Sequence, residues 1–197
     1  MFNKMMGRTR YVVCHIILHL GGSEVAPILG VLNHAAPRQE AIDSEPDIID
    51  VWGEGLKEIC ETLLRYDEYW VSVTNQGEVY WDETDAAQYV DELFTDSAQR
   101  YGSGIELNSD NDYNQPLSIP VTRNVVVMLT VVYKGEVPEL ETDLSNIAAL
   151  KQGLKALIQL HYQHKLLGVY LHFSPSRLGE EVTNDDLLQH YPELIPL

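Results

Sequence analysis

Basic side chains are scarce in this chain of 197 residues. It carries 13 Lys and Arg against 30 Asp and Glu, which gives a formal net charge of −17. Nucleic-acid binding needs a concentrated positive surface, so this balance argues against a nucleic-acid partner and, for the same reason, against an anionic membrane. The basic residues Lys4, Arg8 and Arg10 fall in residues 1–10, which contain no acid. We treat residues 1–10 as a basic tail before a single domain over residues 11–197.

Cysteines and long apolar runs are also few. Cys14 and Cys60 lack the spacing of a zinc site and fall in apolar patterns, so the sequence predicts buried free thiols. No stretch reaches the roughly 20 apolar residues of a membrane span. Residues 4–20 imitate a secretion signal, but His15 and His19 interrupt the apolar run and no cleavage pattern follows. The expected setting is therefore cytoplasmic, without a transmembrane segment.

Catalytic and cofactor motifs are missing as well. The chain has no nucleophile elbow, no HExxH, no paired CxxC and no GxGxxG after a strand. Residues 108–114 alternate Asn and Asp as in a calcium loop, but Tyr113 and Ile119 stand where that loop needs Gly and Glu. We predict no catalytic residue, no metal site and no cofactor. An enzyme or a small-ligand or metal binder of unknown reaction stays open as an alternative.

Hydrophobic periodicity predicts an α/β (α+β) fold in the order β-α-α-β-α-β-α-β-α. The expected strands are residues 11–20, 69–81, 124–133 and 168–175, and the expected helices are residues 25–36, 44–64, 84–101, 144–165 and 183–191. Asn75-Gln76-Gly77 either folds residues 69–81 into a hairpin or ends one short edge strand. Because each helix has one apolar stripe, we expect a single sheet of about four strands with helices mainly on one face.

Helix ends and glycines add smaller expectations. Thr84 and Thr183 are the predicted N-caps of the third and last helices. Gly53 and Gly55 are each expected to destabilise the second helix by up to about 1 kcal/mol relative to alanine. His161, with His164, is expected to neutralise the C-terminal carbonyl groups of the fourth helix.

The two faces of the predicted sheet differ in chemistry. Strand alternation places Cys14, Ile16, Leu18, Val169, Leu171 and Phe173 on an apolar face that should carry the helices. The opposite face carries a mixed set of polar and apolar side chains, namely His15, Ile17, His19, Met128, Thr130, Tyr170 and His172. This mixture favours a protein-docking surface. Two alternatives are loops that cover the face and satisfy the histidines, and a metal site from His15, His19 and His172. The metal site requires the first and last strands to be neighbours.

Two aromatic pairs bracket the predicted edge strand. Tyr69 and Trp70 precede it, and Tyr80 and Trp81 follow it. They either close the edge of the sheet against the helices or form an exposed aromatic contact patch.

Three stretches of the chain resemble one family. These are LLRYDEYW (63–70), NVVVMLTVVYKGEVPEL (124–140) and LLGVYLHFSPSRLGEEVTNDDLLQHYPEL (166–194). Together they are similar to the domain of unknown function 1517 family of cyanobacteria and chloroplasts. The resemblance implies an α/β fold and an accessory role in a photosynthetic cell, but no catalytic residue. Many family members place this domain after a membrane segment near the thylakoid, whereas this chain starts almost directly at its first strand, which implies a soluble form.

The sequence therefore predicts a non-catalytic, acidic interaction protein. Its expected partner is a protein of the photosynthetic apparatus, reached in the cytoplasm or at the thylakoid surface. The acidic surface would steer the chain toward a basic region of that partner. A self-associating structural protein, with a homodimer formed through the edge strand or the open sheet face, is a further alternative.

Overall fold

The computed structural model describes residues 8–35, 47–103 and 122–197. Its strands are β1 (Tyr11–Gly21), β2 (Trp70–Tyr80), β3 (Asn124–Lys134), β4 (Leu166–Ser174) and β5 (Ile195–Pro196). Its helices are α1 (Ile28–Ala35), α2 (Asp47–Arg65), α3 (Glu83–Ser103), α4 (Ile147–Tyr162) and α5 (Asn184–His190), with a short 3-10 turn, η3, at Asp67–Tyr69. The calcium-like run at 108–114 lies outside the described residues.

One antiparallel sheet organises the chain, with the strand order β4-β3-β1-β2-β5. The long strands β1 and β3 lie inside it, each between two neighbouring strands, as expected for β-branched, largely apolar segments. The prediction of about four strands was one short, because β5 has only two residues and pairs only with Ser72 and Val73. Two residues are too few to show a strand periodicity.

Residues 69–81 form a strand as predicted, but neither the hairpin nor the short edge strand is found, since β2 is one continuous strand of 11 residues. Asn75-Gln76-Gly77 stays extended and pairs with residues 14–16 of β1. β2 pairs with β1 along its whole length, from Tyr80 opposite Tyr11 to Trp70 opposite Leu20. This ladder outweighs the preference of the tripeptide for a turn. A local turn would have broken that ladder in its middle.

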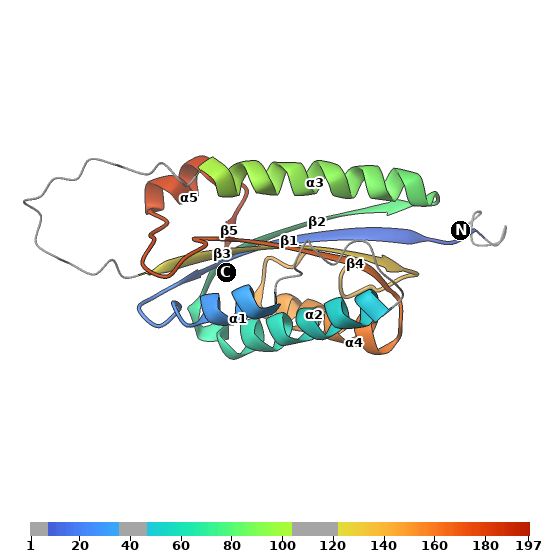
Figure 1. Ribbon diagram of the computed structural model, residues 1–197, viewed down its shortest axis with the longest axis horizontal. Helices are drawn as coiled ribbons and strands as arrows, with labels where there is room; N and C mark the ends of the chain where they lie inside the picture. The colour runs from blue at the N-terminus through green and yellow to red at the C-terminus, as the bar shows by residue number, and fades with distance from the viewer. Residues whose placement is uncertain (1–7, 36–46, 104–121) are drawn as a thin grey trace, which may run out of the picture.

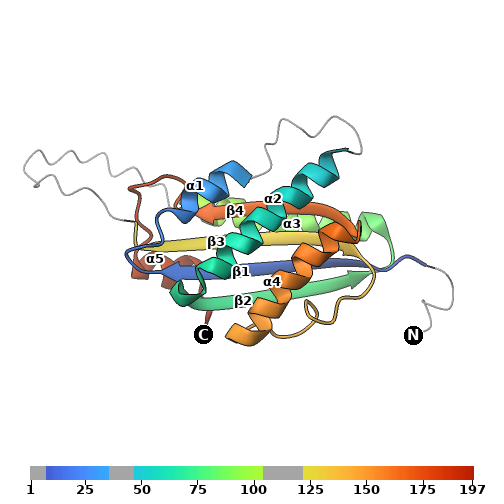
Figure 2. The same cartoon turned by 90° about the horizontal axis from the view of Figure 1, so that it is seen from below.

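Helices cover both faces of the sheet, which corrects the expectation that they pack mainly on one. Figure 1 shows α1, α2 and α4 below the sheet and α3 and α5 above it. Seen from below in Figure 2, α1, α2 and α4 lie in front of the strands. Each of these helices has a single apolar stripe, and the stripe alone does not say which face of the sheet it meets.

The larger core lies between the sheet and α1, α2 and α4. It contains the predicted apolar face, with Cys14, Ile16, Leu18, Val169 and Phe173 buried and Leu171 partly buried. The other face holds two smaller clusters. One joins Val13 and Val132 to Ala86, Val90 and Leu93 of α3, and the other joins Ile17, Val126 and Met128 to Tyr191. Cys14 and Cys60 are buried free thiols, as predicted.

Candidate functional site

The predicted docking face of the sheet is covered. His15, His19, Ile17, Met128 and Thr130 are each at most 6% exposed. The ring of Phe94 on α3 lies 4.7 Å from that of His172 and 6.1 Å from that of Tyr170, measured between centroids. The expectation that this face is open was therefore wrong, because α3 and Tyr191 pack on it. Partner binding by these seven residues stays a prediction.

His15 lies at the polar centre of this layer. Its Nδ1 is 2.7 Å from Oγ1 of Thr130, its neighbour on β3. Burial lowers the pKa of His15 to about 4, and the positive charge of Arg100 acts in the same direction. The imidazole is therefore neutral at pH 7, which suits a buried group with one hydroxyl partner.

His19 is held by both ring nitrogens. Nε2 donates to Oδ1 of Asn124 at 3.0 Å, and Nδ1 accepts from the hydroxyl of Ser72 at 3.2 Å. The amide oxygen of Asn124 can only accept, so this geometry fixes the tautomer with the proton on Nε2. Burial lowers the pKa of His19, although the bond to Asn124 opposes the shift. His19 is a structural crosslink between β1, β2 and β3.

The topology separates the residues of the considered metal site. β3 lies between β1, which carries His15 and His19, and β4, which carries His172. The neighbouring-strand condition is therefore not met. Within the described residues, no group of three His, Cys, Asp or Glu side chains could hold a metal ion.

The two aromatic pairs lie at opposite ends of β2 and do not form one patch. Trp70 is 7% exposed and belongs to the larger core, and Tyr69 packs at its edge against Tyr66. Tyr80 packs on Tyr89 of α3, with 5.7 Å between ring centroids. Trp81 is only half-buried, just past the end of β2.

The outer side of β2 is a feature that sequence reasoning missed. The N–H of Leu197 donates to the carbonyl of Val71 at 3.0 Å, so Val71 and every second residue after it turn their backbone groups away from β1. β5 covers this side only at Ser72 and Val73. Beyond them Asn75, Gly77 and Val79 point the same way, and in the described chain no backbone bond reaches them.

This outer side is also accessible to solvent. Residues 76–79 are all exposed, and Val79 is 38% exposed. The side chain of Asn75 donates to the carbonyl of Thr142 at 2.9 Å and accepts from the N–H of Leu144 at 2.9 Å. We call residues 75–79 the open edge. Such an edge is a template for a further strand.

A hollow of about 310 Å³ adjoins the open edge on the face of α4. Its walls combine apolar groups of both strands, Val12, Cys14 and Val79, with the loop from Leu140 to Asp143. Gly77 lies in its wall opposite Cys14 and contributes no side chain. The absent side chain leaves room beside the edge, and we call this space the Gly77 hollow.

A second and wider pocket, of about 780 Å³, lies where β2 ends. Its aromatic walls are Tyr11, Tyr80 and Trp81, and its carboxylates are Asp82, Glu83 and Asp85. Arg8, Thr9 and Val79 complete the lining. The hydroxyl of Tyr11 donates to Oε2 of Glu83 at 3.2 Å, which joins the aromatic and acidic walls. We call it the aromatic–acidic pocket. Aromatic faces and carboxylates both attract organic cations.

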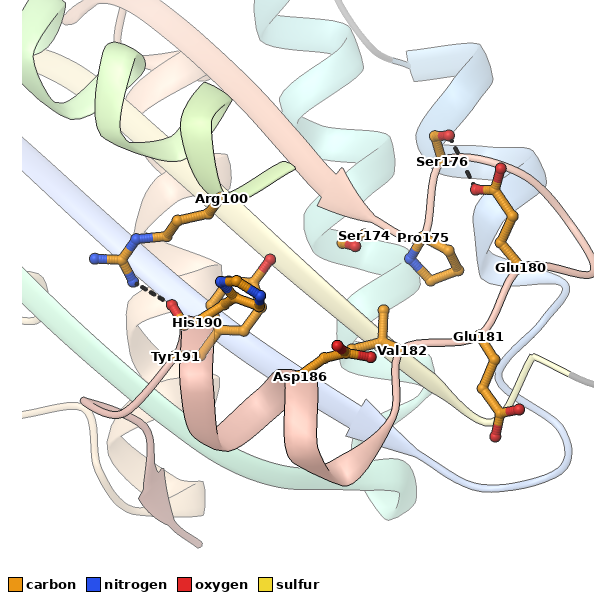
Figure 3. A pocket seen from close by; sticks show the side chains of 10 residues that line it. All are labelled: Arg100, Ser174, Pro175, Ser176, Glu180, Glu181, Val182, Asp186, His190 and Tyr191. Carbon is orange, nitrogen blue, oxygen red and sulfur yellow. Dashed lines mark hydrogen bonds between the residues drawn. The ribbon is translucent and has the colours of Figure 1, made fainter. Parts of the chain in front are cut away.

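A third pocket lies beneath α5 (Figure 3). The turn at Ser174 and Pro175 forms one wall, and Arg100 reaches across to donate to the carbonyl of His190 at 3.1 Å. The hydroxyl of Tyr191 is buried there without a hydrogen-bond partner in the part of the chain that the structure describes. The volume of about 30 Å³ suits one water molecule and no organic ligand.

Comparison with known proteins places the chain in a family. Residues 10–197 match the family profile described as Protein of unknown function (DUF1517). The chain belongs to the DUF1517 family. This confirms the resemblance carried by residues 63–70, 124–140 and 166–194. No curated protein and no solved structure matches the chain. In the ranges described for this DUF1517 protein, no helix combines the length and hydrophobicity needed to cross a membrane.

Proposed function

We propose that this DUF1517 protein is a non-catalytic interaction module that binds a protein partner along the open edge of β2. The observation that carries the proposal is the run of outward backbone groups at Asn75, Gly77 and Val79, beyond the short cover of β5. Peptides commonly bind by adding a strand to such an edge, where backbone hydrogen bonds supply affinity. The mixed sheet face is less suitable, because α3 and Tyr191 cover it.

The proposed setting is a photosynthetic cell, with a partner in the photosynthetic apparatus, in the cytoplasm or at the thylakoid surface. Its support is the family's occurrence in cyanobacteria and chloroplasts, which the resemblance implies. The net charge of −17 favours a partner with a basic contact region.

Site-specific photo-crosslinking in an extract of cyanobacterial cells tests this function. A photoreactive amino acid replaces Gln76, which is exposed on the open edge, and in a matched protein it replaces Leu188, which is 75% exposed on α5. We expect a defined crosslinked protein from position 76 only. Crosslinks that are the same from both positions contradict the proposal.

A proline variant shows whether the backbone of the edge does the binding. Val79→Pro removes an outward N–H without removing a bond to β1, since proline is tolerated where the N–H faces solvent. We expect the crosslink from position 76 to fall about tenfold, as the loss of one hydrogen bond of roughly 1.4 kcal/mol predicts. Val79→Thr keeps the N–H and should crosslink like the wild type. Equal yields from both variants would exclude strand addition.

A further inference from the structure

We propose that the partner of the open edge is an extended basic segment, which seats one apolar side chain in the Gly77 hollow and one Lys or Arg side chain in the aromatic–acidic pocket. This inference rests on the proposed function and specifies its ligand. It joins three neighbouring features: an unpaired strand edge, a hollow on one face of it, and a cation-attracting pocket at its end.

The register of a sheet explains the apolar contact. A residue that pairs directly opposite Gly77 projects its side chain to the same face as a Gly77 side chain would. That face is the one covered by α4, because Val73 and Val79 alternate in phase with Gly77 and Val73 lies in the larger core. The added side chain therefore enters the Gly77 hollow, where Val12, Cys14 and Val79 supply apolar walls. Glycine makes this possible, since any larger residue would occupy the space itself.

The end of β2 explains the basic contact. Trp81 follows Gly77 by four residues, which is about 13 Å along an extended chain. Two of the pocket's aromatic walls, Tyr11 and Tyr80, lie on the α3 face, opposite to the face of the Gly77 hollow. A side chain three positions from the apolar one projects to that face and reaches the aromatic–acidic pocket. There Asp82, Glu83 and Asp85 are exposed, and Arg8 is the one cation among the described residues that line it. Ring faces and carboxylates together suit a guanidinium or an ammonium group.

Charge decides between a basic partner and a second copy of this chain. Pairing two copies through residues 75–79 would bring together two molecules of net charge −17. Glu78 lies on the open edge itself, and the three carboxylates of the aromatic–acidic pocket would approach the partner copy. Like charges across a contact oppose it, whereas a basic segment is attracted to the same surface.

Selection from a display library of random decapeptides tests the inference with a defined probe. We expect the peptides retained by the wild-type protein to share an apolar residue and a Lys or Arg three positions away, an odd spacing that puts the two side chains on opposite faces of the added strand. Retained peptides without a basic residue, or with no apolar residue at that spacing, overturn the proposal.

Matched variants assign each preference to its pocket. Gly77→Val fills the hollow. The added Cβ lies 3.3 Å from the Val13 carbonyl oxygen, a tight contact that the backbone relieves by shifting a few tenths of an ångström. We expect at least tenfold weaker binding of the selected peptides. The double variant Glu83→Gln, Asp85→Asn should weaken Lys- and Arg-containing peptides tenfold, whereas Asp185→Asn, which removes a remote exposed acid on α5, should not. Circular dichroism checks that each variant is folded.

The inference and the proposed function fail in different ways. If Gln76 crosslinks a cellular partner but the library yields no peptide, or the selected peptides ignore these variants, the inference is wrong and the interaction edge remains. If no cellular partner crosslinks at position 76, the proposed function is wrong whatever the library yields. Light scattering detects a second copy, and a stable dimer that Val79→Pro dissolves would overturn the basic partner.

Discussion

His15 shows, at the scale of one residue, how a polar group can be an ordinary part of a core. It is 3% exposed, and its side chain is hydrogen-bonded to the hydroxyl of Thr130. Arg100, Asp96 and His172 are the charged and titratable groups that act on its proton affinity, and burial is the largest influence. The sequence placed His15 and Thr130 on one face correctly, but the pattern of a strand cannot show that α3 will cover that face.

The lowered pKa of His15 predicts a loss of stability in mild acid. The folded pKa of about 4 lies below the unfolded value of 6.5, so between these values the unfolded chain binds more protons. The contribution of His15 to the free energy of unfolding is fully present above pH 6.5 and decreases as the pH falls toward 4. From pH 7 to pH 5 the free energy of unfolding should decrease by about 2 kcal/mol on account of His15 alone.

Urea unfolding at the two pH values measures this effect. His15→Gln keeps a hydrogen-bonding side chain but cannot titrate. Between pH 7 and pH 5 the free energy of unfolding of this variant should therefore fall by about 2 kcal/mol less than that of the wild type. The lowered pKa values of Asp67, Asp143 and Asp186 act at lower pH, so they do not confuse the comparison. If wild type and variant lose equal stability, His15 is not the titrating group.

At the scale of the element, glycines and caps show what local sequence can and cannot predict. Thr183 caps α5 as predicted, and Asp186 completes a capping box with it. The predicted cap Thr84 was wrong, because α3 starts at Glu83 and the carboxylate of Asp82 accepts the N–H of Thr84 at 2.8 Å. Adjacent candidates for a cap differ by one or two residues, which a pattern does not resolve.

Gly53 of α2 has a role that only the packing reveals. A Cβ added there would lie 1.9 Å from Nδ1 of His161 on α4. The ring thus fills the space beside Gly53, and its Nε2 lies 3.1 Å from Oε1 of Glu54. The prediction that His161 would serve the end of its own helix missed this contact between helices. No spacing rule connects two residues that are 108 positions apart.

Alanine at Gly53 should therefore destabilise the protein, although alanine favours helices. We expect a loss of about 1–3 kcal/mol from overpacking. Gly30 of α1 is the matched control, since an added Cβ there meets nothing within 4 Å. Gly30→Ala should stabilise the protein by about 0.5–1 kcal/mol. Thermal or urea unfolding measures both, and a gain of stability at both glycines would contradict the packing argument.

At the scale of the whole molecule, the two helical layers are unequal. The layer of α1, α2 and α4 shares one large apolar core with the sheet, including Leu150, Leu154 and Leu157 at helical spacing. On the other face, α3 packs on one smaller cluster and Tyr191 on another. Buried polar residues such as His15 and Ser97 also lie on that side. The sequence predicted the apolar stripe of each helix. That α3 packs on the sheet face opposite α1, α2 and α4 is seen only in the three-dimensional structure.

This inequality predicts different opening energies for the two layers. Regions with few buried apolar contacts open locally at lower free energy than the main core. Backbone amides of residues 86–97 in α3 should therefore exchange with deuterium at least tenfold faster than those of residues 150–160 in α4. Mass spectrometry after timed labelling at pH 7 makes the comparison. Equal protection of the two helices would show that the smaller cluster of Val13 and Val132 holds α3 as firmly as the larger core holds α4.

The position of β1 inside the sheet matters for the way the chain is made. β1 is covered on both faces, and residues 12–20 are all buried in the finished fold. Its partners arrive late in synthesis, since Tyr11 pairs with Tyr80 and with Lys134. A ribosome must therefore add more than a hundred residues before β1 gains its second neighbour. During that interval β1 exposes apolar side chains to which chaperones bind. Because its strand pairings join residues far apart in the sequence, we expect the domain to fold slowly.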